Sequence, residues 1–106
     1  MREFTLKEVC EMTGASRRAI QGYETLGLVS ASGRNKYGHL LYDEIALGRI
    51  RNIKFYHDLG FTRRMTLVLL ECTVEEKKRM IRERINFLNK EINRLQKMIS
   101  EAENMI

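Results

Sequence analysis

Apolar side chains recur at alternating intervals of four and three residues through the C-terminal part of the chain. The stripe consists of Ile81, Ile85, Leu88, Ile92, Leu95, Ile99, Ala102 and Ile106. An unbroken repeat of this kind over more than three heptads is typical of a coiled-coil helix. The chain contains no proline that would interrupt it. We therefore predict one helix over residues 74–105, roughly 48 Å long, with Thr73 and Glu76 forming a capping box at its start.

This stripe also predicts a homodimer. A chain of 106 residues has too little apolar surface elsewhere to cover a seam of that length. The predicted dimer residues are Ile81, Ile85, Leu88, Ile92, Leu95, Ile99 and Ala102. The alternative is a helix that lies along its own domain. Isoleucine alternating with leucine would favour a parallel pair, but the charges favour an antiparallel one. Residues 75–84 hold five basic and three acidic groups, whereas residues 99–106 hold two acidic groups and no basic one, so Arg82 would lie near Glu103 of the partner subunit.

The N-terminal part predicts two short helices joined by a tight turn. Thr5 and Glu8 form a capping box for a helix over residues 6–13, which Gly14 ends. Ser16 is a suitable cap for a second helix over residues 17–26, with Gly27 following it. Two short helices joined by a turn that contains glycine are the layout of a helix-turn-helix.

Residues 28–42 predict a β-hairpin that would form a wing beside the helix-turn-helix. Its predicted strands are the apolar ends, Leu28-Val29 and residues 40–42, and a polar, glycine-containing stretch separates them. The predicted tip carries side chains that can reach phosphate oxygens, and Gly33 and Gly38 there allow close approach of the backbone. These side chains are Arg34, Asn35, Lys36 and Tyr37.

Two further helices follow the hairpin. Asp43 would cap a helix over residues 44–59 that Gly60 ends, and Thr62 would cap a helix over residues 63–71. The first has a stripe of Ala46, Ile50, Ile53 and His57, with Ile45 and Tyr56 beside it. The second contains the run "LVLL" at residues 67–70, which predicts burial on most sides. The predicted fold class is mainly α, with a winged helix-turn-helix domain over residues 1–73 and a coiled-coil helix over residues 74–106.

The formal net charge of +5 is typical of a small domain that binds nucleic acid. A lysine-rich, solvated surface is the alternative explanation. Cys10 and Cys72 are the only cysteines and form no CxxC motif, which indicates a reducing compartment. No apolar signal segment and no run of membrane-spanning length occurs. We therefore expect a cytoplasmic protein with no membrane partner.

The order of these parts resembles the MerR family of bacterial transcription regulators. The resemblance covers essentially the whole chain, through "FTLKEVCEMTGASRRAIQGYETLGLV", "GRNKYGHLLYDE" and "IRNIKFYHDLGFT", followed by the coiled-coil helix. It implies a homodimer with an antiparallel coiled coil that binds a pseudo-palindromic promoter site. It also implies that the protein bends and untwists the spacer between promoter elements so that RNA polymerase engages both, which is recognition through DNA deformability.

We predict ten DNA-contacting residues from the residue pattern together with this resemblance: Arg17, Arg18, Gln21, Tyr23, Arg34, Asn35, Lys36, Tyr37, His39 and Tyr42. The sequence departs from the family pattern at two places. Gln21-Gly22-Tyr23 stands where the family usually has Arg-Tyr-Tyr, and Gly38-His39-Leu40 stands where it usually has Gly-Tyr-Arg. Each lost phosphate contact should lower DNA affinity and flatten its salt dependence. Gln21 either reads an adenine or remains a solvated or phosphate-touching side chain.

The sequence predicts no enzyme, no cofactor and no metal site. It contains no nucleophile with a neighbouring base, and "GRNKYG" lies in a hairpin rather than between a strand and a helix as a phosphate loop does. Cys72 falls where metal-sensing relatives place one ligand, but a closed soft-metal site needs further thiolates. We interpret it as structural rather than as a metal or redox sensor. The alternative function is a structural or adaptor protein that anchors chromosomes or binds a partner.

Overall fold

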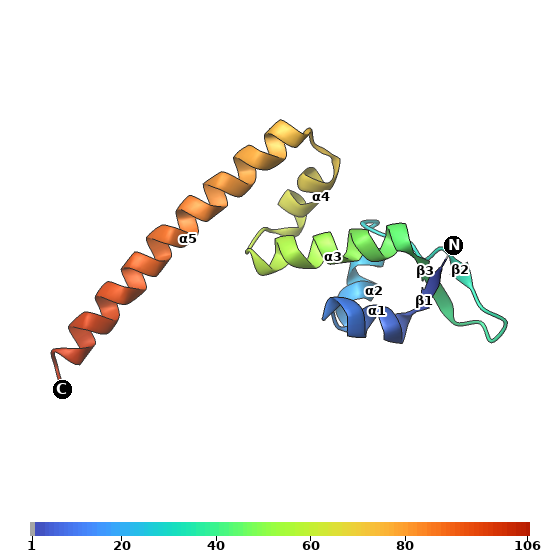
Figure 1. Cartoon of the computed structure of the whole chain (residues 1–106), viewed down its shortest axis with the longest axis horizontal. Helices are drawn as coiled ribbons and strands as arrows, with labels where there is room; N and C mark the ends of the chain where they lie inside the picture. The colour runs from blue at the N-terminus through green and yellow to red at the C-terminus, as the bar shows by residue number, and fades with distance from the viewer. Residues whose placement is uncertain (1) are drawn as a thin grey trace. The chain divides into compact units, whose positions relative to one another are not determined.

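The computed structural model describes residues 2–106, which divide into two compact units between Leu70 and Glu71. The first unit holds a small sheet and four helices, and the second holds one long helix (Figure 1). The predicted mainly helical, winged helix-turn-helix class is confirmed. The elements of the first unit, in chain order, are β1 (Glu3–Thr5), α1 (Leu6–Thr13), α2 (Arg17–Thr25), β2 (Gly33–Arg34), β3 (Leu40–Asp43), α3 (Glu44–Asp58) and α4 (Arg63–Glu71).

Local hydrogen bonds define the helix-turn-helix. Thr5 Oγ1 accepts from Glu8 N at 3.3 Å, and Thr5 N donates to Glu8 Oε1 at 3.0 Å, which completes the predicted capping box of α1. Gly14 follows α1 with φ 77°, a left-handed conformation that glycine adopts without steric cost. Ser16 Oγ then accepts from Ala19 N at 3.0 Å and caps α2. The bounds of α1 are as predicted, and α2 ends one residue earlier than predicted.

The three strands form an antiparallel sheet in the order β1-β3-β2. Phe4 pairs with Tyr42, and Gly33 pairs with Leu41. The prediction of Leu28-Val29 as the first wing strand is wrong: both side chains are buried in the core, and β2 begins at Gly33. An apolar pair gains more from that burial than from a place at a sheet edge. The N-terminal strand β1 was not predicted, because three residues are too few to show an alternating pattern.

The core of the first unit gathers side chains from the sheet and from α1, α2 and α3. On α3 the buried residues are Ala46, Leu47, Ile50, Ile53 and Tyr56. The predicted stripe is therefore partly wrong: Ile45 is 74% exposed, and Leu47 is buried instead. His57 is also exposed, because it lies in the last helical turn and lines an open hollow rather than the core.

The prediction that α4 is buried on most sides is wrong. Thr66 and Leu69 are its buried residues, and they lie three positions apart on one narrow face. Leu67 and Val68 in the same run are each nearly half exposed. Thr62 caps the helix as predicted, because its Oγ1 accepts from Met65 N at 3.2 Å.

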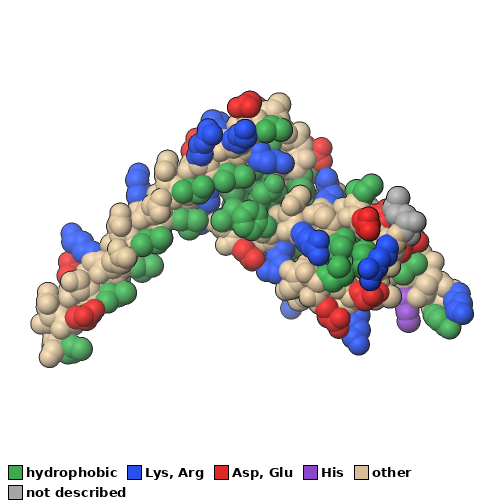
Figure 2. Space-filling model, in the orientation of Figure 1, with side chains coloured by type: hydrophobic (Ala, Val, Ile, Leu, Met, Phe, Trp, Pro, Cys, Tyr) green, Lys and Arg blue, Asp and Glu red, His purple; other side chains and the backbone are tan. Residues whose placement is uncertain are grey.

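The second unit consists mainly of α5 (Val74–Glu103), which is one uninterrupted helix (Figure 1). Thr73 Oγ1 accepts from Glu76 N at 3.2 Å and so caps the helix; this is one of the two hydrogen bonds of the predicted capping box. Ion pairs within the helix join Arg79 to Glu83 at 3.0 Å and Arg94 to Glu91 at 2.9 Å. None of the α5 residues is fully buried, and hydrophobic side chains follow one side of the helix (Figure 2). Ile85, Ile92, Leu95 and Ile99 of the heptad stripe are exposed.

Candidate nucleic-acid interface

Helix α2 presents a polar and basic face to solvent. Arg17, Arg18 and Gln21 are all exposed, whereas Ile20 on the opposite side of the helix is fully buried and anchors it to the core. Since Gln21 lies four positions after Arg17 and three after Arg18, and residues three or four positions apart share a side of a helix, the amide lies on one side of α2 with each guanidinium group. Such a face offers donors to both phosphate oxygens and base edges.

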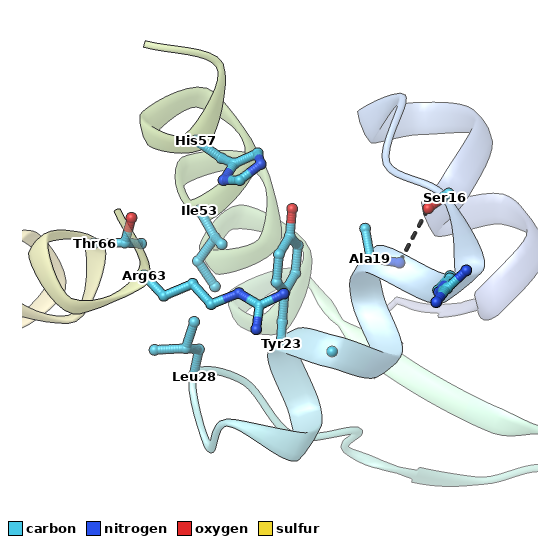
Figure 3. Close-up of a pocket in the computed structure, with 10 residues that line it drawn as sticks. Ser16, Ala19, Tyr23, Leu28, Ile53, His57, Arg63 and Thr66 are labelled. Atoms are coloured by element: carbon cyan, nitrogen blue, oxygen red, sulfur yellow. Dashed lines mark hydrogen bonds between the residues drawn. The ribbon is translucent and has the colours of Figure 1, made fainter. Parts of the chain in front are cut away.

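Tyr23 lies apart from this face. Its side chain is half-buried and lines a hollow together with Leu28 and Ile53, which are buried residues. This burial raises the pKa of the Tyr23 phenol, so the group stays neutral at physiological pH. Figure 3 shows its ring between α2 and α3, with the hydroxyl directed into the hollow. Arg18 also lines this hollow, whereas Arg17 lines a different one. The structure therefore does not gather Tyr23 and the two arginines in one place, although the sequence predicted all three as DNA contacts.

Two of the four predicted wing-tip residues hold the tip in shape. Asn35 Oδ1 accepts from Tyr37 N at 2.9 Å and from His39 N at 3.0 Å. Arg34 Nη1 donates to the Gly38 carbonyl at 2.6 Å. These bonds order a loop that would otherwise lose conformational entropy on meeting a partner. Arg34 and Asn35 thus have an internal role that the sequence pattern did not reveal.

The other tip residues project outward. Tyr37 is 72% exposed, and Lys36 and His39 are exposed as well. Lys36 Nζ lies 5.2 Å from the centre of the Tyr37 ring, within the range of a cation–π contact. The centres of the Tyr37 and His39 rings are 6.4 Å apart. The tip therefore presents one ammonium group beside the Tyr37 ring, with the His39 ring next to that of Tyr37, on an ordered loop.

A basic cleft lies between the start of α1, the start of α2 and the wing. We define the basic cleft by Lys7, Arg17 and His39, which line a hollow of about 410 Å³ together with Thr5, Leu6 and Leu40. Lys7 was not predicted. The available signal was its place at the beginning of the first helix, which the turn of a helix-turn-helix brings near the beginning of the second. The cleft joins predicted residues of α2 and of the wing in one site that suits a phosphate group.

Tyr42 does not belong to this interface, and its prediction as a DNA contact is corrected. Its side chain is fully buried, and its hydroxyl donates to Glu24 Oε1 at 2.5 Å. Burial, followed by the hydrogen bond to this carboxylate, raises the pKa of Tyr42 far above its ordinary value. Because strand residues alternate between faces, the register with Phe4 directs Tyr42 inward.

Gly22 leaves an opening at the edge of the exposed face of α2. A Cβ atom added at this position would meet nothing within 4 Å outside the glycine's own helix and neighbours. Packing therefore does not require a glycine here. Its absent side chain instead contributes to the hollow that Tyr23 lines.

Residues 2–106 contain no group of three or more His, Cys, Asp or Glu side chains that could hold a metal ion. Cys72 is partly buried. Within the same described range, none of the helices has both the length and the apolar character needed to cross a membrane.

Comparison with known proteins gives a match to the family described as the MerR HTH family regulatory protein, over residues 4–65. The matched range is more than half of the 106 residues and contains the helix-turn-helix, the wing and α3.

Individual relatives agree with this match. The chain is 29% identical to the HTH-type transcriptional activator TipA of Streptomyces coelicolor over 94% of its own length, and it spans 40% of the length of TipA. The solved structure of HiNmlR, described as a MerR family regulator lacking the sensor domain and bound to promoter DNA, has a TM-score of 0.78 at 19% identity and covers 93% of this chain and 80% of that one. MtaN, the N-terminus of a Bacillus subtilis multidrug transporter activator, has a TM-score of 0.74 at 24% identity, with 96% of each chain covered. At these identities the two structures are similar in fold.

Proposed function

The chain belongs to the MerR HTH family, and we propose that it is a transcription regulator that binds promoter DNA in a sequence-specific manner. The observation that carries this proposal is the ordered basic surface of the first unit. Arg17, Arg18 and Gln21 project from α2, and Lys36 projects from the wing tip. The family match favours a regulator over a structural or adaptor protein, the alternative that the sequence left open.

In the proposed complex, α2 enters the major groove and the wing contacts the phosphate backbone. The N-terminal residues of a recognition helix are those that meet base edges, which are Arg17, Arg18 and Gln21 here. Gln21 would read an adenine through its amide. The basic cleft would hold a backbone phosphate, which fixes the register of the helix without reading sequence.

The proposed DNA-binding form is a homodimer that pairs through the heptad stripe of α5. Nothing in the second unit covers this stripe fully, because none of the α5 residues is buried. Burial of aliphatic side chains in a partner's seam would contribute about 25 cal/mol for each Å² of apolar surface.

Arg82 and Glu103 favour antiparallel pairing. Exchanging one charge with Arg82→Glu should weaken such a dimer, and adding Glu103→Arg should restore it, whereas a parallel dimer would show no such restoration.

A dimer with two DNA-binding domains requires a pseudo-palindromic site, because half-sites in DNA mirror the two-fold symmetry of the protein. We further propose that the dimer distorts the spacer between two promoter elements, so that RNA polymerase engages both without direct contact with this protein. Specificity then depends on the deformability of the spacer as well as on base contacts.

Footprinting on the DNA upstream of the protein's own gene and its neighbours tests the proposed function. Protection between two promoter elements with a hypersensitive centre is the expected pattern, since a distorted duplex exposes its central steps. Protection without a hypersensitive centre would exclude the distortion but keep the DNA binding. No protection at any of these sites, at low salt and micromolar protein, would contradict the proposal.

A further inference from the structure

A second hollow in the first unit is chemically unlike the basic cleft. It lies among α2, α3, α4 and the segment after α2, and it has a volume of about 290 Å³. Ligand pockets in proteins usually measure roughly 300–1,000 Å³, so this hollow suits a small molecule of one or two rings. We call it the Gly22 pocket, after the residue that leaves it open. Its lining residues are Ser16, Arg18, Ala19, Gly22, Tyr23, Leu28, Ile53, His57, Arg63 and Thr66.

The floor of the Gly22 pocket is apolar. Leu28 is 3% exposed and Ile53 is 1% exposed. Each side chain therefore lines the pocket with a small part of its aliphatic surface, and the rest is packed in the core. Ala19 adds a methyl group from α2. A flat ring placed against these side chains would displace water from apolar surface. Residues held this firmly would also change little on binding, which lowers the entropic cost of association.

The rim of the pocket is cationic. Arg63 reaches across from α4 toward Tyr23, and His57 points into the same space from α3 (Figure 3). Arg18 of α2 also lines the pocket. The nearby acidic group, Asp58, is already paired with Lys54 Nζ at 2.7 Å. Two guanidinium groups that flank an apolar floor match a carboxylate attached to a ring, because arginine binds carboxylates through two parallel hydrogen bonds.

We propose that the Gly22 pocket binds a small aromatic carboxylate and that its occupancy opposes DNA binding. The ring would lie on Leu28 and Ile53, the carboxylate would accept from Arg18 and Arg63, and the Tyr23 hydroxyl would donate to a polar ring substituent. Arg18 also belongs to the exposed face of α2, so a bound anion would withdraw one cation from DNA. It would also place a negative charge beside the phosphate backbone. This second consequence rests on the proposed function, whereas the binding itself does not.

Titration of the full chain with 2-naphthoate, followed by amide chemical shifts without DNA, tests the site. We expect shifts at residues that line the Gly22 pocket. Arg63→Gln should weaken binding about tenfold, because a charge-assisted hydrogen bond contributes about one factor of ten or more in an equilibrium constant. Arg64→Gln is the matched control: Arg64 is an exposed neighbour that does not line the pocket, so this change should leave affinity within about twofold.

A second variant fills the pocket without removing a charge. Gly22→Leu should abolish 2-naphthoate binding while the far-ultraviolet circular dichroism stays unchanged, since the added Cβ meets no neighbour. Shifts confined to the basic cleft, equal affinity in Arg63→Gln and Arg64→Gln, or no binding at millimolar 2-naphthoate would each overturn the assignment of the site. None of these results bears on the footprint, so the proposed function would stand.

Competition with DNA tests the regulatory half of the proposal. Saturating 2-naphthoate should lower the affinity for the footprinted promoter fragment by about tenfold at fixed salt, and Gly22→Leu should make DNA binding insensitive to the ligand. Benzyl alcohol, which lacks the carboxylate, is the control ligand and should have no effect. Unchanged DNA affinity with the pocket occupied would show that the site does not regulate DNA binding.

Discussion

The hydroxyl of Tyr42 donates a hydrogen bond to Glu24 Oε1 at 2.5 Å, which joins strand β3 of the wing to helix α2. Glu24 is half-buried and lies about two turns further along α2 than Arg17, whose side chain is exposed. The bond therefore fixes the strand against the helix without occupying the surface proposed to meet DNA. Two elements that are separated in sequence and proposed to contact DNA are held together by this bond, and such preorganisation lowers the cost of binding.

Removal of this hydrogen bond should destabilise the protein. We predict that Tyr42→Phe lowers the free energy of unfolding by about 1–3 kcal/mol, because the ring still fills the core while the Glu24 carboxylate loses its buried donor. Urea denaturation followed by circular dichroism measures this change. Tyr37→Phe removes the same hydroxyl from an exposed residue and should change stability by less than about 0.5 kcal/mol. Equal effects of the two substitutions would show that the Tyr42–Glu24 bond is not stabilising.

The same residue predicts a loss of stability at high pH. The pKa of Tyr42 is raised in the folded protein, first by burial and then by the Glu24 carboxylate. A free tyrosine ionises near pH 10, so above that pH the unfolded chain releases a proton that the folded protein retains. The contribution of Tyr42 is therefore complete below about pH 10 and declines as pH rises further. Unfolding curves between pH 8 and pH 11 should fall more steeply for the natural protein than for Tyr42→Phe, and parallel curves would contradict the raised pKa.

Much of the helical framework could be predicted because its signals are local. A capping hydroxyl, a glycine after the last turn and a heptad repeat each act within one helix, so Ser16, Asp43 and Thr73 all cap the helices that the sequence assigns to them. The interactions that form the strands are less local. The short strand β1 exists only because β3 pairs with it, and no pattern within three residues indicates that pairing.

The site was harder to predict than the fold for the same reason. Tyr42 and Tyr37 are both tyrosines in or near a basic hairpin, and residue type alone does not show that one is buried while the other is exposed. Their difference follows from the sheet register, which is a long-range property. Likewise, Lys7 joins the basic cleft and Arg63 joins the Gly22 pocket through the packing of separate elements. Counting charges along the sequence does not reveal which residues of separate elements line the same site.

Substitution of Gly22 should stabilise the protein. Alanine favours a helix interior over glycine by about 1 kcal/mol, and the added methyl group meets no neighbour. We therefore predict that Gly22→Ala raises the midpoint of thermal unfolding by roughly 4–8 °C, as about 1 kcal/mol does in a domain of this size. Gly27→Ala is the matched control, because Gly27 has φ 74° and an alanine there is strained. A lower midpoint for Gly22→Ala would indicate that this glycine has a structural role in α2.

Phosphate contacts should appear in the salt dependence of DNA binding. Each neutralised phosphate contributes about 0.9 to the slope of log affinity against log salt concentration. We predict that Arg17→Ala and Lys36→Ala each weaken binding to the footprinted promoter and reduce that slope by about one unit. Gel-shift titrations at several salt concentrations measure both quantities. Lys97→Ala removes one charge from the second unit and serves as the control. A slope unchanged by all three substitutions would remove Arg17 and Lys36 from the proposed interface.

A charge in the α5 seam should disrupt the proposed dimer. Ile92 is half exposed and lies in the middle of the heptad stripe, so pairing would bury it against a partner. We predict that Ile92→Lys makes the protein monomeric at concentrations where the natural chain is dimeric, because an unpaired ammonium group buried in an apolar seam costs several kcal/mol. Sedimentation velocity measures the change. Asn93→Lys adds the same charge one position away, off the stripe, and should leave the dimer intact. A dimer that survived Ile92→Lys would show that the chains associate through another surface, and a natural chain that sedimented as a monomer would remove the two-headed mode of promoter binding proposed above.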